Sequence, residues 1–232
     1  LADVTTPINP DNHKNVKLVG WLPATTVHEG YTGDQVCQDC GKTISKGKVI
    51  PKKTGAAPVD PEPTEPAKHE DYTDVQAGDW YYDAVAYVSE HGLMDGVGSG
   101  KFNPEGAVTR AMVWTVLARM AGEDTEGGST WYSKAQEWVM ETGVSDGTNP
   151  MASITREQLA AMLYRYAGSP AVTGSLSAYP DAGEVSDWAV DAMVWATEEG
   201  IINGMGGNLS PKTGATRAQL AAMLMRLEQN VL

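Results

Sequence analysis

Apolar residues recur at helical spacing in three similar segments, which begin at residues 109, 155 and 216. Intervals of three and four residues place side chains on one face of an α-helix. The residues at this spacing are Leu159, Met162, Leu163 and Tyr166 in the second segment and Leu220, Met223, Leu224 and Leu227 in the third. We therefore predict three helices, each with one buried face, that belong to an internal repeat.

Polar residues mark the start of each predicted helix. Each segment opens with a threonine, whose side-chain oxygen can accept a hydrogen bond from a free N–H of the first turn. Gln158 and Gln219 follow Thr155 and Thr216 by three residues, which completes a capping box. Met112 takes this place in the first segment, so we predict an incomplete box there.

All six arginines of the chain lie in these segments, two in each and always nine residues apart. At about 100° per residue, this step puts the two arginines of one helix on opposite sides. The later arginine of each pair falls near a helix C-terminus, where a cation is favourable. The earlier one falls at an N-terminus, where a cation is unfavourable: Arg110, Arg156 and Arg217. We therefore expect an anion beside each of these three, either a protein carboxylate or a ligand.

A second helix is predicted ahead of each segment, over residues 80–92, 131–143 and 188–200. Each of these stretches begins with tryptophan and ends with glycine, which is a common residue just past a helix end. Trp80, Trp131 and Trp188 open apolar stripes, so we favour a place in the core for them. The alternative is that their aromatic faces pack against a sugar.

The first and third units share an opening motif and a long glycine-containing loop that the second unit lacks. Asp74 lies in Tyr-Thr-Asp and Asp181 in Tyr-Pro-Asp, each a few residues ahead of a predicted helix. We expect the two aspartates either to cap the following turn or to contact a ligand. The second unit has no such opener, and its loop is cut to residues 144–153.

The N-terminal part of the chain has a different pattern. Partial alternation over residues 16–21 and 42–50, interrupted by glycines, predicts a small β module. Four prolines and five acidic residues in 54–71 predict an extended spacer. We therefore divide the chain into a linker (1–12), a β module (13–53), the spacer (54–71) and three repeats at 72–122, 129–168 and 178–232.

Charge and hydropathy narrow the range of partners. The 232 residues carry a net charge of −13, which argues against nucleic acid. No apolar run approaches the length of a membrane span, so we expect no membrane partner. The first residues have neither the basic start nor the apolar stretch of a signal peptide. We therefore expect the chain to continue an upstream part of a larger exported protein.

Cys37 and Cys40 could form half of a zinc site, with His13 and His28 as the other ligands, because thiolates and imidazoles suit tetrahedral zinc. The spacing is not diagnostic, and we favour a turn whose cysteines are thiols or a local disulfide. The four histidines are scattered and form no catalytic constellation. We therefore expect neither catalysis nor a cofactor.

The succession Trp, Ala-Val, Gly-Leu-Met-Asp-Gly, Phe-Asn-Pro and Val-Thr-Arg-Ala over residues 80–111 resembles the S-layer homology domain. The resemblance covers residues 72–232. It implies a mainly α fold, with three repeats packed as a pseudo-threefold spindle and grooves between neighbours. It also implies non-covalent binding to secondary cell-wall polysaccharide, often through a pyruvylated amino sugar, outside a Gram-positive cell. Residues 30–41 resemble small repeats of secreted clostridial proteins, although a third cysteine of those repeats is missing.

The ligand implied by this resemblance could supply the anion that we expect beside the arginines. A pyruvate ketal carries a carboxylate, which suits both a guanidinium and a helix N-terminus. The candidate ligand-binding residues are Arg110, Arg217, Arg156, Asp74, Asp181, Trp80, Trp188, Gly96, Gly204, Gln219 and Gln158.

Two alternatives remain open at this stage. Each of the three arginines could instead pair with a carboxylate of a neighbouring repeat, and such a pair could open when a ligand arrives. Because the second unit is reduced, we expect fewer than three working sites and rank Arg110 and Arg217 ahead of Arg156. At the level of function, the alternative is a protein-interaction or self-assembly module.

Overall fold

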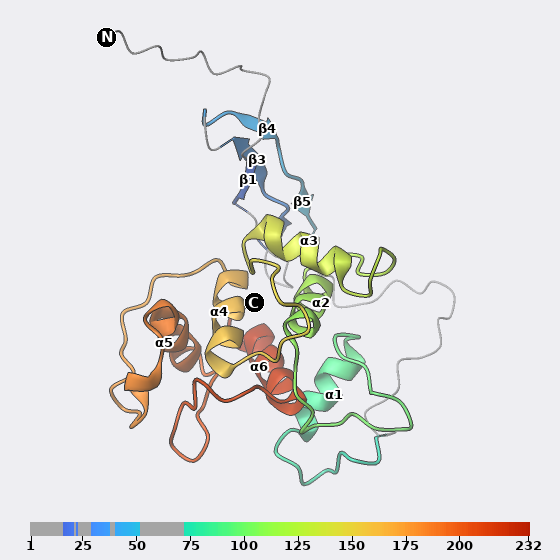
Figure 1. Cartoon of the computed structure of the whole chain (residues 1–232), viewed down its shortest axis with the longest axis vertical. Helices are drawn as coiled ribbons and strands as arrows, with labels where there is room; N and C mark the ends of the chain where they lie inside the picture. Colours follow the sequence, from blue (N-terminus) through green and yellow to red (C-terminus); the bar gives the residue numbers. More distant parts are fainter. Residues whose placement is uncertain (1–15, 21, 23–28, 38–39, 52–71) are drawn as a thin grey trace.

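The computed structural model describes residues 16–20, 22, 29–37, 40–51 and 72–232. These residues form a mainly α structure with a small β module at its N-terminal end, as the sequence predicts (Figure 1). None of the described helices is long and apolar enough to cross a membrane.

The β module consists of short antiparallel strands. Strands β1 (Val16–Val19), β3 (Asp34–Cys37) and β4 (Thr43–Ser45) form one sheet in the order β1-β3-β4. Strands β2 (Gly30–Tyr31) and β5 (Val49–Ile50) pair separately. β1, β4 and β5 fall within the two stretches where alternation was found. β2 and β3 were not predicted, because the pattern of residues 30–37 is not alternating.

Six α-helices follow, as three successive pairs of an outer and an inner helix. The outer helices are α1 (Tyr82–Glu90), α3 (Ser133–Thr142) and α5 (Val190–Glu198). The inner helices are α2 (Arg110–Met120), α4 (Arg156–Tyr166) and α6 (Arg217–Asn230). Two 3₁₀ turns, η2 (Ala182–Glu184) and η3 (Asp187–Ala189), lead into α5. Figure 1 shows the inner helices gathered in the middle and the outer helices around them.

The pairs are interlocked in a cycle. Each outer helix packs against the inner helix of the preceding pair: α3 against α2, α5 against α4, and α1 against α6. The last of these contacts joins the first pair to the third, so the cycle is closed. The apolar stripe predicted for the second segment is buried as expected, since its four residues are at most 2% exposed.

Backbone hydrogen bonds close the same cycle where the inner helices begin. The N–H of Ile154 donates to the carbonyl of Val108 (3.0 Å), that of Ala215 to Ile154 (2.9 Å), and that of Val108 to Ala215 (3.1 Å). All three side chains are buried. The three helix starts therefore surround one approximate threefold axis, and this fixes how their N-terminal residues face their neighbours.

All three inner helices are capped by threonine. The side chains of Thr109, Thr155 and Thr216 accept from the backbone N–H three residues later. The prediction of an incomplete box in the first segment is wrong, because the Met112 sulfur accepts from the Thr109 N–H at 3.5 Å. A thioether is a weak acceptor, so it can take the place of the glutamine amide at a longer distance.

Candidate functional site

Three grooves on the helical part of the chain share one plan. Each contains the loop after an outer helix, the inner helix of the same pair, the first arginine of another inner helix, and a tryptophan from the remaining pair. Every groove thus draws on all three pairs. The closed cycle of helices is what brings these distant parts of the sequence together.

Groove A has a volume of about 180 Å³. Asp95, Met112 and Arg119 come from the first pair and its loop, whereas Trp131 comes from the second and Arg217 from the third.

Groove B has a volume of about 470 Å³. Asp146, Gln158 and Arg165 come from the second pair and its loop, whereas Trp188 comes from the third and Arg110 from the first.

Groove C has a volume of about 150 Å³. Asn203, Gln219 and Arg226 come from the third pair and its loop, whereas Trp80 comes from the first and Arg156 from the second. Gly204 also lines this groove, with a φ of +77°, and a Cβ there would lie 3.0 Å from the carbonyl oxygen of Asn208.

The three tryptophans at the grooves are exposed. Their exposed fractions are 62% for Trp80, 51% for Trp131 and 55% for Trp188. The expectation that they belong to the core is therefore wrong. Each lies in the turn ahead of an α-helix and not within its apolar stripe, since α1, α3 and α5 begin at residues 82, 133 and 190. Exposed aromatic faces beside a polar groove are suited to stacking on a ligand.

Arg156 and Arg217 are buried, and neither has an acidic partner among the described residues. Arg156 is 4% exposed and Arg217 is 8% exposed. The Nε of each donates to a backbone carbonyl across a boundary between pairs, at 2.8 Å, to Leu209 and Phe102 respectively. Within the described part of the chain, no carboxylate oxygen lies within ion-pair distance of either guanidinium.

The burial of these two arginines is electrostatically unfavourable. Burial lowers the pKa of both guanidinium groups. Asp181 partly offsets this at Arg156, and Tyr72, Asp95 and Asp74 partly offset it at Arg217. An unpaired charge removed from water costs several kcal/mol, on the order of the loss in breaking a buried ion pair. Both arginines also have N–H groups beyond those used to hold the carbonyls, because a guanidinium offers five donors. An anion in groove A or C would neutralise the buried charge and accept hydrogen bonds from the remaining N–H groups.

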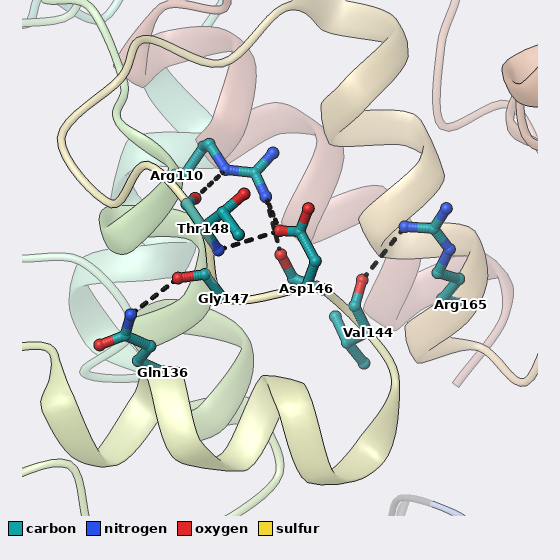
Figure 2. Close-up of polar contacts among 8 residues, drawn as sticks. Arg110, Gln136, Val144, Asp146, Gly147, Thr148 and Arg165 are labelled. Atoms are coloured by element: carbon teal, nitrogen blue, oxygen red, sulfur yellow. Dashed lines mark hydrogen bonds and ion pairs between the residues drawn. The ribbon is translucent and has the colours of Figure 1, made fainter.

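Arg110 is different, because groove B supplies its own anion. Its Nη2 donates to Oδ1 of Asp146 at 2.5 Å and to Oγ of Ser145 at 3.1 Å. Its Nε donates to the Thr148 carbonyl at 2.8 Å, as the other two arginines do to theirs. Figure 2 shows Arg110 reaching into the loop that holds Asp146 and Thr148. The Thr148 N–H first, and the charge of Arg110 as well, hold the pKa of the Asp146 carboxyl below its ordinary value.

The late arginines of the inner helices also belong to the grooves. Their Nη1 atoms donate to equivalent loop carbonyls, those of Leu93, Val144 and Ile201, at 3.4, 3.4 and 3.2 Å. The two arginines of one helix line different grooves, as the nine-residue step predicts. The negative end of the helix dipole is enough to explain a cation at Arg119, Arg165 and Arg226, so the sequence does not predict their place in the grooves.

Asp74 and Asp181 have a different role from the one expected. The carboxylate of Asp74 accepts from the N–H groups of Phe102 and Asn103, both at 2.9 Å. That of Asp181 accepts from Leu209 (2.9 Å) and Ser210 (2.7 Å). These bonds span 28 or 29 residues, so the aspartates do not cap the turn that follows them. They hold the returning end of the long loop, and neither is among the residues that line grooves A, B and C.

Of the remaining candidate binding residues, some line a groove and others have a structural position only. Gln158 and Gln219 line grooves B and C while their side-chain oxygens accept from the cap residues. Gly96 is tightly enclosed, because a Cβ there would lie 2.6 Å from the Tyr72 ring. Cys37 is buried and Cys40 exposed, and His13 and His28 lie outside the described residues. No group of acidic, cysteine and histidine residues in the described ranges could hold a metal ion.

Three residues that line the grooves were not predicted from the sequence. Asp95, Asp146 and Asn203 are equivalent, since each lies three residues after the glycine that follows an outer helix. Aligning the loops on these glycines would have shown the exchange of aspartate for asparagine in the third unit. Groove A therefore has two arginines and one aspartate, as does groove B, whereas groove C has two arginines and no acidic residue among its described lining.

Two parts of the helical region match the model of a known protein family. The model of the S-layer homology domain matches residues 71–111 and 178–221. The Amylopullulanase of Thermoanaerobacterium thermosulfurigenes is 30% identical over 170 residues, which are 64% of this chain and 9% of that protein. The Surface-layer 125 kDa protein of Lysinibacillus sphaericus is 27% identical over 169 residues, or 64% of this chain and 14% of that protein.

The S-layer protein sap of Bacillus anthracis is 27% identical over 174 residues, which cover 68% of this chain and 21% of that protein. The chain thus spans at most about a fifth of the length of these three relatives. S-layer homology segments shared with surface proteins of Gram-positive bacteria indicate an extracellular protein associated with the cell wall.

Proposed function

We propose that residues 72–232 form three S-layer homology repeats that bind a secondary cell-wall polysaccharide and so hold a larger exported protein on a Gram-positive cell. The single observation that carries the proposal is the pair of nearly buried arginines, Arg156 and Arg217, which have no acidic partner in the described chain and open into grooves. Each groove is bordered by an exposed tryptophan, as a sugar-binding groove requires.

The chemistry of the groove favours a sugar that carries a carboxylate. A guanidinium can bind a carboxylate through two parallel N–H···O bonds. Both arginines are the first residue of their helix, where the positive end of the helix dipole adds to the attraction of an anion. A pyruvate ketal on an amino sugar presents such a carboxylate next to a ring, whose C–H face would lie against the tryptophan.

The structure favours a different ranking of sites from that of the sequence. Arg110 is already paired with Asp146, whereas Arg156 and Arg217 are not paired with an acid in the described residues. We therefore infer that grooves C and A bind the polysaccharide and that groove B does not. Such a module needs no catalytic residues, so any enzymatic activity would belong to another part of the longer protein.

Co-sedimentation of the full chain with purified cell walls tests this function. Intact walls are compared with walls stripped of their secondary polysaccharide, using the parent chain and the variants Arg156→Ala and Arg217→Ala. We expect intact walls alone to carry the parent down, and each variant to bind more weakly while its circular dichroism is unchanged. Equal sedimentation with both wall types would reject the polysaccharide as the ligand. Absence of binding to either wall would favour a protein-interaction module.

A further inference from the structure

Groove B contains its own substitute for a ligand carboxylate. We propose that Asp146 is an internal competitor that closes groove B to acidic sugars, and that removing its charge creates a third binding site. This inference rests on the proposed function, because it concerns the same ligand chemistry in the equivalent groove.

The geometry at Arg110 is that of a filled anion site. Asp146 places a carboxylate oxygen 2.5 Å from Nη2 of Arg110, whose Nε binds the Thr148 carbonyl. The same carboxylate oxygen accepts from the N–H of Thr148 at 3.0 Å. A ligand carboxylate would therefore have to displace a charge that already has two hydrogen-bond donors.

The loop that holds Asp146 is fixed from both sides. Gln136 of α3 donates from Nε2 to the Gly147 carbonyl at 2.7 Å, and Arg165 of α4 donates to the Val144 carbonyl at 3.4 Å. Figure 2 shows these two contacts on either side of Asp146. The carboxylate is thus held beside Arg110 by a short, clamped loop, so closing the groove requires no movement of the chain.

The difference from the other grooves follows from loop length. In groove B Asp146 lies only two residues before Thr148, whose carbonyl anchors the arginine. In groove A the equivalent Asp95 lies seven residues before its anchor, Phe102, with a turn between them in which Gly98 pairs with Lys101. The longer loop directs the Asp95 carboxylate to the late arginine of the same pair, Arg119, at 3.5 Å.

Groove C cannot be closed in this way. Its equivalent residue is Asn203, which has no charge and lies six residues before the anchor carbonyl of Leu209. Arg156 and Arg226 therefore face this groove without a carboxylate among the described lining residues. The three grooves form a graded series, from closed (B) through open with one acidic residue (A) to open with none (C).

The number of binding sites for an acidic sugar tests the proposal. The probe is the 4,6-pyruvate ketal of an N-acetylhexosamine methyl glycoside, as the gluco and manno epimers, and the neutral 4,6-isopropylidene ketal is the control. Calorimetric titration of the full chain should give two sites for the parent and three for Asp146→Asn. The third site should disappear again in Asp146→Asn/Arg110→Ala. Asp124→Asn, which breaks a surface ion pair outside the grooves, should leave two sites.

The outcomes separate the inference from the proposed function. Two sites in both the parent and Asp146→Asn, or three sites already in the parent, would overturn the role of Asp146 while leaving the anchoring function intact. A gained site that persists without Arg110 would also overturn it. No heat from the acidic probe with parent and variant alike would reject the proposed ligand itself. Asp146→Asn is nearly isosteric, and Arg110 keeps its Thr148 and Ser145 contacts, so the variant is expected to fold.

Discussion

At the scale of single residues, the proposed function depends on which positive charges have no acidic partner among the described residues. Six arginines occupy equivalent positions in pairs, yet their surroundings differ. Arg110 has a carboxylate from a neighbouring loop, whereas Arg156 and Arg217 have backbone carbonyls. Burying Arg156 and Arg217 without an acid among the described residues lowers the stability of the folded protein, and it favours the binding of an anionic ligand.

Replacing Arg156 by lysine tests whether the shape of the cation matters as well as its charge. Lysine keeps the charge but cannot form two parallel bonds to a carboxylate. We expect Arg156→Lys to weaken binding to intact walls about tenfold, or ~1.4 kcal/mol. Binding isotherms from co-sedimentation give this value, with Lys134→Arg on the surface as the control exchange. Unchanged affinity in Arg156→Lys would show that the guanidinium does not hold the ligand.

The exposed tryptophans allow a matched comparison of binding and stability. Trp80 is 62% exposed, whereas Trp114 is fully buried in α2. We expect Trp80→Ala to change the free energy of unfolding by about 0.5 kcal/mol or less, and Trp114→Ala to lower it by about 3–5 kcal/mol. Wall binding of folded Trp80→Ala should nevertheless fall. Urea titrations and co-sedimentation measure the two effects, and a large stability loss in Trp80→Ala would contradict a surface role.

At the scale of helices and loops, the long loops are held by aspartates that come from the opening motifs. Burial raises the pKa of the Asp181 carboxyl, but the N–H groups of Leu209 and Ser210 outweigh this and leave it below its ordinary value. A lowered folded-state pKa means that the contribution of Asp181 to stability is present above the unfolded value of about 4. This contribution is lost as the pH falls through the folded-state pKa.

Acid denaturation should therefore depend on Asp181. We expect Asp181→Asn to be less stable than the parent at pH 7 and to lose less stability than the parent between about pH 5 and pH 2. Thermal unfolding followed by circular dichroism across this range is the measurement, with exposed Glu105→Gln as the control. Parallel stability curves for parent and Asp181→Asn would show that this carboxylate does not hold the loop in solution.

The helices themselves could be predicted from the sequence, because the information is local. Thr155, Gln158 and the apolar residues at helical spacing after them define one helix without reference to the rest of the chain. The prediction of strands was incomplete, because strand pairing is not local: β3 pairs with β1 and β4, and no short sequence pattern reveals these partners. The exposure of Trp80 was mispredicted because two residues decide whether it lies in the apolar stripe of α1 or in the turn before it.

At the scale of the whole molecule, the grooves are a consequence of the closed cycle. Each inner helix starts beside the next around one axis, so an arginine from one pair projects into a groove built mainly by another. The sequence alone predicted an anion beside Arg110 but could not name Asp146, which lies 36 residues away. Net electrostatics of a groove thus depends on the assembly of all three pairs and not on any one repeat.

Salt should weaken wall binding by the whole chain, because the proposed attraction is between fixed positive and negative charges. We expect wall affinity to fall several-fold as ionic strength rises from about 0.1 M to about 1 M, where the screening length drops from ~10 to ~3 Å. Sucrose at matched osmolarity controls for solvent effects. Sedimentation that strengthens with salt would instead indicate an apolar contact of the kind expected for protein association.

The most direct test of whether an acidic sugar fills these grooves compares two preparations of cell wall. One is intact, and the other has lost its pyruvate ketals to mild acid but retains its polysaccharide chains. The full chain is titrated against both. If buried Arg156 and Arg217 bind the ligand carboxylate, affinity should fall at least tenfold on the depyruvylated walls, and the double variant Arg156→Ala/Arg217→Ala should bind the two wall types equally or nearly so. Equal affinity of the parent for both walls would contradict the central claim that an acidic sugar fills these grooves.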